Sequence, residues 1–183
     1  MSTLLVTGPS RSGKSEWAEQ LAERLSEDGR QQVVYIATAQ IDPSDLAWQA
    51  RIDLHQKRRP AHWQCQEVPV ALAEAIAAHS ARHCLLIDSL GTWLANLIDQ
   101  SAEEWDLLQS QFLQCLCETE ATIIVVAEET GWGVVPAYET GRVFRDRLGA
   151  LSRKVGAIAA ETYLVTCGYA LPLSKIAQPI SKT

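Results

Sequence analysis

Eight consecutive residues near the start of the chain have the types and spacing that bind phosphate. They are Gly8-Pro9-Ser10-Arg11-Ser12-Gly13-Lys14-Ser15, a full match to G-x-x-x-x-G-K-[ST]. In such a loop, glycines let backbone N–H groups turn toward phosphate oxygens, and the following helix adds its positive dipole end. Lys14 would reach the β- and γ-phosphates, and the Ser15 hydroxyl would coordinate Mg²⁺. The motif predicts a nucleoside triphosphate site; the alternative is a chance turn of glycine and serine.

Carboxylates follow two later apolar runs. Asp88 ends the run at 84–87, and we expect it to be the second magnesium ligand, although an N-cap of the next helix is an alternative. Glu128 and Glu129 follow the run at 122–127, where one of them could act as a base or hold a substrate hydroxyl. A solvated pair in a loop is the alternative. Carboxyl ends of parallel strands share one edge of a sheet, so all three could face the same ligand.

A second group of positive charge lies at residues 51–63. This segment contains Arg51, Lys57, Arg58 and Arg59, which are 4 of the 16 basic residues, and two of the four histidines, His55 and His62. On a helix, Arg51, His55 and either Arg58 or Arg59 would share one face. The positive charges would keep the imidazole of His55 neutral and nucleophilic and would neutralise a triphosphate. A solvated basic helix face, with no role for His55, is the alternative.

The elements that position these groups follow from the apolar pattern. Buried strands are expected at 3–7, 33–37, 84–88 and 122–127, with a short strand at 65–68 and a last strand at 162–166 that closes the sheet. Helices are expected at 14–25, from 42 to before Pro60, and at 70–79, 93–98, 103–117 and 138–160. This alternation predicts an α/β fold, a mostly parallel sheet with helices on both faces. We expect one domain over residues 1–183, with a frayed tail from about residue 178.

Composition limits the class of protein. The 183 residues are 47% hydrophobic and 21% charged, as in a folded domain, and the net charge of −6 argues against nucleic acid as a partner. No apolar run reaches the roughly 18 to 20 residues of a membrane helix, and no secretory leader is visible. The five cysteines, an odd number, favour a reduced, cytoplasmic location. We expect Cys115 and Cys117, which lie in an apolar helical pattern, to be buried structural thiols rather than a metal pair.

The phosphate loop alone leaves kinases, GTPases, motor ATPases and regulatory switches open. None of the five lysines lies in the N/T-K-x-D motif that reads guanine in small GTPases, and the transporter signature L-S-G-G-Q is absent. An enzyme acting on a small molecule remains. Two alternatives stay open beside the two-activity enzyme described below. One is an enzyme with kinase activity alone, and the other is a nucleotide-gated binding module without transfer activity.

Five segments, in chain order from residue 4 to about residue 168, make that assignment possible. They are Leu5-Val6-Thr7-Gly8 with Arg11-Ser12-Gly13-Lys14-Ser15, Tyr35-Ile36-Ala37-Thr38, Arg51-Ile52…His55…Arg59-Pro60…Trp63, Glu129…Gly131-Trp132-Gly133-Val134-Val135-Pro136, and Arg142…Phe144-Arg145-Asp146. The patterns H-x-x-x-R-P-x-x-W and E-x-G-x-G-x-V-P are far more specific than the phosphate loop. On these segments the chain resembles the bifunctional adenosylcobinamide kinase/adenosylcobinamide-phosphate guanylyltransferase family of cobalamin biosynthesis.

The resemblance implies a RecA-like P-loop NTPase fold, a homotrimer, and two reactions in one active centre. A nucleoside triphosphate phosphorylates adenosylcobinamide, and GMP then passes from GTP through a guanylylated histidine to adenosylcobinamide phosphate. That histidine falls on His55. ATP and GTP are the co-substrates, with Mg²⁺ held by Ser15 and Asp88. Beyond the phosphate loop, the implied nucleotide contacts are Thr38, Ala39, Gln40, Gln56, Lys57, Arg58, Arg59, Glu67 and Asp88.

The chain departs from the family pattern in three places. Leu54 stands where some relatives have a second histidine, so His62 is the remaining rival to His55. Asp88 stands where some members have glutamate, and Ser152-Arg153 where an Asn-Gln pair is frequent. Trp132, between two glycines in an expected loop, is our candidate for contact with the large corrin substrate; the other five tryptophans are expected in the core or at interfaces. The helix at 138–160 is expected to pack on its own sheet.

Overall fold

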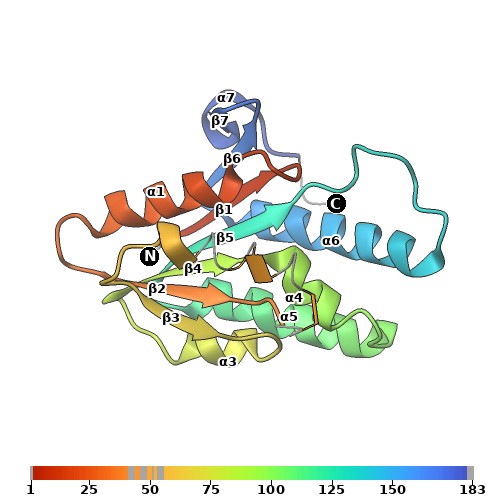
Figure 1. The fold of residues 1–183 in the computed structure, drawn as a ribbon, viewed down its shortest axis with the longest axis horizontal. Helices are drawn as coiled ribbons and strands as arrows, with labels where there is room; N and C mark the ends of the chain where they lie inside the picture. The colour runs from red at the N-terminus through yellow and green to blue at the C-terminus, as the bar shows by residue number, and fades with distance from the viewer. Residues whose placement is uncertain (1, 41–43, 46–48, 51, 53–55, 181–183) are drawn as a thin grey trace.

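The computed structural model describes residues 2–40, 44–45, 49–50, 52 and 56–180. These residues form a seven-stranded sheet with the order β3-β2-β4-β5-β1-β6-β7 (Figure 1). Every neighbouring pair is parallel except β6 and β7, which are antiparallel. The strands are β1 (Thr3–Gly8), β2 (Gln32–Ala37), β3 (Gln64–Glu67), β4 (His83–Asp88), β5 (Thr122–Glu128), β6 (Glu161–Thr166) and β7 (Tyr169–Pro172).

Helices cover both faces of this sheet. They are α1 (Lys14–Ser26), α3 (Leu72–Ala77), α4 (Leu90–Asn96), α5 (Ala102–Glu118), α6 (Glu139–Ile158) and the short α7 (Leu173–Ile176). Helix α1 packs on one face, and α3, α4, α5 and α6 pack on the other (Figure 1). Residues 49–50, 52 and 56–58 are helical, within the helix expected to end before Pro60. The expected fold class, α/β with a mostly parallel sheet covered on both faces, is confirmed.

The core explains why the apolar runs are continuous. Along each central strand, successive side chains point to opposite faces, and both faces are buried. In β5, Ile123 and Val125 face the helices α3 to α6, whereas Ile124 and Val126 face α1. All four side chains are fully buried. The expected packing of α6 on its own sheet is likewise confirmed, because Leu148, Leu151 and Val155 belong to the larger core cluster.

The expectation that the sheet ends at residues 162–166 was wrong. Strand β7 adds to the edge of β6, with Thr166 opposite Tyr169. The two-residue turn between them has a positive φ at both positions, 50° at Cys167 and 80° at Gly168, which is the geometry of a type I′ hairpin turn. Cysteine is not one of the residues that usually signal this turn, so the hairpin was missed.

Two helix boundaries also differ from expectation. Helix α4 begins at Leu90 rather than Trp93, because Ser89 caps it in a capping box with Thr92. Helix α3 spans Leu72–Ala77 rather than 70–79. Residues 178–180 form no helix or strand, and the last three residues of the expected tail lie outside the described part of the chain.

The expectation that Cys115 and Cys117 are both buried was wrong, because Cys117 is exposed. Cys84 is buried and Cys115 half-buried, but Cys65, Cys117 and Cys167 are exposed, and all five are free. Among the tryptophans, Trp93 and Trp105 are buried, Trp17 and Trp63 are half-buried, Trp132 is exposed, and Trp48 lies outside the described residues. No helix in the described part of the chain is long and apolar enough to span a membrane.

Candidate nucleotide site

The phosphate loop joins the end of β1 to the start of α1, as its motif predicts. Both glycines of the loop are required by geometry. A Cβ on Gly8 would lie 2.3 Å from the carbonyl oxygen of Val165, and Gly13, the N-cap of α1, has a φ of 90°. Lys14 is buried, and its Nζ lies 3.4 Å from the carbonyl oxygen of Pro9. The loop therefore presents the N-terminus of α1 and the Lys14 ammonium beside the carboxyl edge of the sheet.

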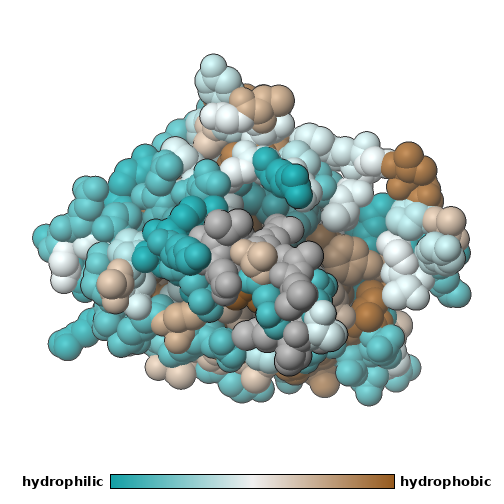
Figure 2. Space-filling model, in the orientation of Figure 1, coloured by the Kyte–Doolittle hydropathy of each residue, from teal (hydrophilic) through white to brown (hydrophobic). Residues whose placement is uncertain are grey.

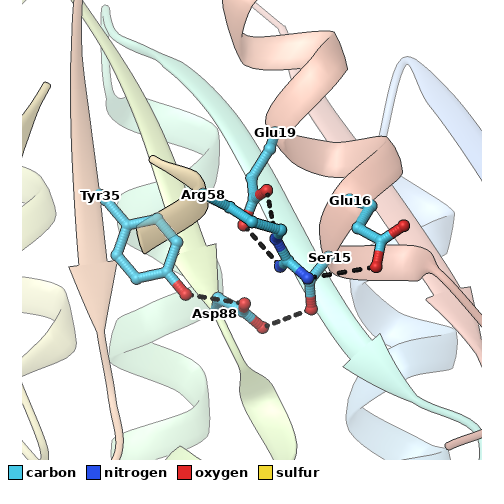
Figure 3. Close-up of polar contacts among 6 residues, drawn as sticks. All are labelled: Ser15, Glu16, Glu19, Tyr35, Arg58 and Asp88. Atoms are coloured by element: carbon cyan, nitrogen blue, oxygen red, sulfur yellow. Dashed lines mark hydrogen bonds and ion pairs between the residues drawn. The ribbon is translucent and has the colours of Figure 1, made fainter. Parts of the chain in front are cut away.

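Asp88, at the end of β4, lies between two hydroxyl groups (Figure 3). Ser15 Oγ donates to its Oδ1 at 3.4 Å, and Tyr35 Oη donates to its Oδ2 at 2.8 Å. Burial, followed by the charge and hydrogen bond of Asp88, raises the pKa of Tyr35. The phenol is therefore a hydrogen-bond donor at neutral pH. The alternative N-cap role for Asp88 is wrong, because the cap of α4 is Ser89.

Ser15 and Asp88 fit a magnesium ion that also binds nucleotide phosphates. Mg²⁺ prefers hard oxygen ligands and is usually held by one or two protein groups, with phosphates and waters completing the octahedron. One hydroxyl from the start of α1 and one carboxylate from the end of β4 are such a set. The described residues contain no cluster of three or more His, Cys, Asp or Glu that could hold a metal without phosphate.

Glu128 holds the start of α4 rather than standing free in a loop. Its Oε1 accepts from Ser89 Oγ at 2.5 Å and its Oε2 from the backbone N–H of Gly91 at 2.9 Å. Thr38 binds the same turn from the other side, since its Oγ1 donates to the carbonyl oxygen of Ser89 at 2.7 Å. Both contacts fix the backbone immediately after Asp88. Glu129 instead accepts from the Gly131 N–H in the following loop.

The two neighbouring arginines of the basic segment have different partners. Arg58 is ion-paired with Glu16 and Glu19 of α1, at 3.1 Å and 2.9 Å (Figure 3). Burial, the largest single influence, lowers the pKa of Arg58, but the hydrogen bond and charge of Glu19 and the charges of Glu16 and Asp88 together raise it. Arg59 lies over the ring of Tyr35, with its Cζ 3.8 Å from the ring centroid. Only Arg59 of this pair lines the cavity described next.

A cavity of about 320 Å³ brings most of these groups together. Of the predicted site residues, it is lined by Ser10, Lys14, Ser15, Ala39, Gln56, Arg59, Glu67, Asp88 and Glu128. The others that are described, which do not line it, are Gly8, Pro9, Arg11, Ser12, Gly13, Thr38, Gln40, Lys57, Arg58 and Glu129. His62 is exposed and does not line it either. His55, the predicted nucleophile, and Arg51 lie outside the described residues.

Several lining residues were not assigned to the site from the sequence. They are Tyr35, Ala37, Ile52, Cys65, Ser89, Gly91, Thr92, Ala95, Thr130 and Phe144. Tyr35, Ala37, Ile52 and Phe144 stand in the segments that carry the family resemblance. Tyr35 left a further signal, because a tyrosine inside an apolar strand needs a partner for its hydroxyl when it is buried. The rest reach the cavity because neighbouring elements meet there, which no local pattern records.

A P-loop on β1, a carboxylate at the end of β4 and a mostly parallel sheet define a P-loop nucleotide-binding protein of the α/β class. Solved structures agree on the fold. One of them, an ATPase domain, matches with a TM-score of 0.53, 11% identity and coverage of 89% of this chain and 68% of that chain. The flagellar accessory protein FlaH from Methanocaldococcus jannaschii matches with a TM-score of 0.50, 15% identity and coverage of 92% and 74%.

Sequence comparison gives the particular family. The family model of cobinamide kinase / cobinamide phosphate guanyltransferase matches residues 4–173, so the chain belongs to this family. A Pseudomonas aeruginosa relative, bifunctional adenosylcobalamin biosynthesis protein CobP, is 39% identical over 92% of this chain and 95% of its own length. The Escherichia coli relative, bifunctional adenosylcobalamin biosynthesis protein CobU, is 36% identical over 90% of this chain and 96% of its own length. The resemblance inferred from the motifs is confirmed.

Proposed function

We propose that this protein phosphorylates adenosylcobinamide with a nucleoside triphosphate and then transfers GMP from GTP to adenosylcobinamide phosphate. One observation carries the proposal: residues of the phosphate loop and of the H-x-x-x-R-P pattern line the same cavity. Lys14 and Ser15 come from the loop, and Gln56 and Arg59 from the pattern. Both reactions would therefore use one nucleotide pocket within one domain.

The kinase step follows from the placement of Lys14 and Asp88. The substrate hydroxyl oxygen attacks the γ-phosphorus and its proton is released to solvent. The bond to the β-phosphate bridging oxygen breaks, and a nucleoside diphosphate leaves. Lys14, buried at the start of α1, offsets the charge that develops on the phosphate oxygens. Mg²⁺ held by Ser15 and Asp88 would supply further neutralisation of the same charge.

The guanylyl transfer divides into two displacements. The imidazole of His55 attacks the α-phosphorus of GTP, and pyrophosphate leaves. A phosphate oxygen of adenosylcobinamide phosphate then attacks the same phosphorus, the P–N bond breaks, and the histidine is released with formation of adenosylcobinamide-GDP. Arg59 lines the cavity together with Gln56, and its guanidinium would stabilise charge on the transferring phosphate in both displacements.

The direct test is labelling with GTP that carries a radioactive α-phosphate. Wild-type protein should retain an acid-labile, base-stable label, and His55→Ala should retain none. His62→Ala is the matched control, because His62 is exposed outside the cavity. The His55→Ala variant should still transfer the γ-phosphate of ATP to adenosylcobinamide. Equal labelling of His55→Ala and wild type would show that the nucleophile is another residue.

We also propose that the protein is a homotrimer and lies in the cytoplasm. The resemblance implies a homotrimer, and the odd number of free cysteines favours a reduced, cytoplasmic setting. Light scattering of the purified protein gives its mass directly. A mass of one or two chains at the concentration used for activity would contradict the trimer.

A further inference from the structure

Tyr35 belongs to the core by burial and to the site by position. It is 3% exposed and packs in the cluster beneath α1, yet it lines the nucleotide cavity. In the register of β2 and β4, Tyr35 is opposite Leu86 and Ala37 is opposite Asp88. The long side chain of Tyr35 therefore runs along the sheet toward its carboxyl edge and ends at the Asp88 carboxylate (Figure 3).

The hydroxyl of Tyr35 gives the two oxygens of Asp88 different surroundings. Oδ2 accepts from the phenol at 2.8 Å, and Oδ1 faces Ser15 Oγ at 3.4 Å. Because the shorter bond engages one oxygen, the carboxylate is held with its other oxygen directed toward Ser15. Groups that orient a metal ligand in this way tune metal affinity without touching the metal.

The ring of Tyr35 has a second partner. The guanidinium of Arg59 lies over it, 3.8 Å from its centroid, and an Nη1 contact of 3.1 Å to Cys65 Sγ holds the same guanidinium from the side. Arginine prefers the face of an aromatic ring because the ring quadrupole attracts the cation. Tyr35 therefore contacts two charged groups of the same cavity: its hydroxyl contacts the Asp88 carboxylate, and its ring contacts the Arg59 guanidinium.

We propose that Tyr35 is a positioning residue of the nucleotide site: its hydroxyl orients Asp88 toward the magnesium side, and its ring seats Arg59 toward the phosphates. The inference rests on the proposed function only in assuming that a magnesium nucleotide occupies the cavity. The hydroxyl and the ring of Tyr35 have different roles in this proposal, so a variant that keeps the ring and one that removes it should give different results.

The test measures binding of a non-hydrolysable GTP analogue by calorimetry, with Mg²⁺ varied and with EDTA. Tyr35→Phe keeps the ring and loses the hydroxyl. This variant should raise the Mg²⁺ concentration needed for half-maximal binding of the analogue about tenfold, which is the low end of the effect of removing a hydrogen-bond partner of a metal ligand. Its binding of the analogue in EDTA should be unchanged. Tyr163→Phe is the matched control, because Tyr163 is also buried and also bonds a carboxylate, Glu161, outside the cavity. It should change neither quantity.

The ring is tested with Tyr35→Leu, Arg59→Gln and their combination. Each single change should weaken binding in EDTA, and the double variant should lose no more than Arg59→Gln alone, since Tyr35→Leu acts through Arg59. An unchanged Mg²⁺ dependence in Tyr35→Phe, or full additivity in the double variant, would overturn the proposal. Thermal melting checks that each variant folds. If Tyr35→Leu does not fold, Tyr35→Trp replaces it, because this variant changes the shape of the aromatic face beneath Arg59 but keeps an aromatic ring. Tyr35→Trp should bind the analogue in EDTA as Tyr35→Phe does. The assay needs no corrinoid, so its outcome is independent of whether GMP is transferred.

Discussion

Arg58 donates two hydrogen bonds to Glu19, from Nη2 to Oε1 at 2.9 Å and from Nε to Oε2 at 3.1 Å (Figure 3). The two residues lie 39 positions apart in the chain. The pair ties the segment that carries the H-x-x-x-R-P pattern to the helix that follows the phosphate loop. The Glu19 side chain is 12% exposed and that of Arg58 is 34% exposed, so the contact is partly shielded from water. In this structure the Arg58 guanidinium is directed to α1 rather than into the cavity.

We therefore expect Glu19→Gln to destabilise the protein by about 1 kcal/mol, near the upper end for ion pairs that retain solvent contact. Glu16→Gln is the matched control. Glu16 also pairs with Arg58, but its side chain is 60% exposed, so its loss should cost less than about 0.5 kcal/mol. Urea unfolding of both variants gives the comparison. Equal stability of the two would show that the pair with Glu19 is as well screened as the pair with Glu16.

Cysteine alkylation should report occupancy of the cavity. Cys65 is exposed and lines the cavity, whereas Cys117 on α5 and Cys167 in the β6–β7 turn are exposed outside it. Saturating Mg-GTP analogue should slow alkylation of Cys65 and leave the other two unchanged, as measured by mass spectrometry of peptides. Slowing of all three thiols together would point to global stabilisation instead of protection within the site.

Cys84 should resist the same reagent. Burial raises its pKa to about 12, and a raised pKa means less reactive thiolate at any given pH. At pH 8 the folded protein should therefore show no modification of Cys84, and modification should appear when urea unfolds the chain and the pKa returns to that of a free thiol. Rapid alkylation of Cys84 in the folded protein would contradict its burial in the core beneath α1.

Gly91→Ala should disturb the turn after Asp88. A Cβ at this position would lie 2.2 Å from Glu128 Oε2, so the carboxylate must move and release the Ser89 hydroxyl and the Gly91 N–H. We expect a loss of about 1 to 3 kcal/mol in the free energy of unfolding. Gly149→Ala on α6 is the control. Apart from its chain neighbours and the backbone of its own helix, no heavy atom lies within 4 Å of a Cβ there, and a gain of roughly 0.5–1 kcal/mol is expected for a helical glycine. Equal stability of the two variants would contradict a role for the close contact between Gly91 and Glu128.

The loop that joins β5 to α6 is the expected contact for the corrin part of the substrate. Figure 2 shows a small hydrophobic patch on this loop. Among its exposed large hydrophobic side chains, Trp132 is 64% and Val134 is 94% exposed, and Thr130 at its base lines the cavity. Trp132→Ser should raise the KM for adenosylcobinamide phosphate several-fold and leave GMP labelling by GTP unchanged. Leu107→Ser on α5, at 60% exposure, controls for loss of an exposed apolar side chain. An unchanged KM would remove the loop from the substrate site.

The sequence could predict what depends on neighbours in the chain. The phosphate loop, its glycines and the helix that follows are set by adjacent residues, and the apolar strands by continuous burial, so both were predicted correctly. The start of helix α4 was misplaced and strand β7 was missed, because each depends on a single signal, the Ser89 cap for α4 and the Cys167-Gly168 turn for β7. The family followed from spaced patterns that local reading can recognise.

The partners of the site residues were decided by tertiary structure alone. Tyr35 lies 53 positions from Asp88, and Ser15 lies 73 positions from it, so only the strand order and register bring the three side chains together. By sequence Arg58 and Arg59 are equivalent neighbours, yet one pairs with α1 and the other stacks over Tyr35 in the cavity. Sequence determined which charged groups are present; folding determined which of them face one another, because that depends on distances between elements that no local pattern encodes.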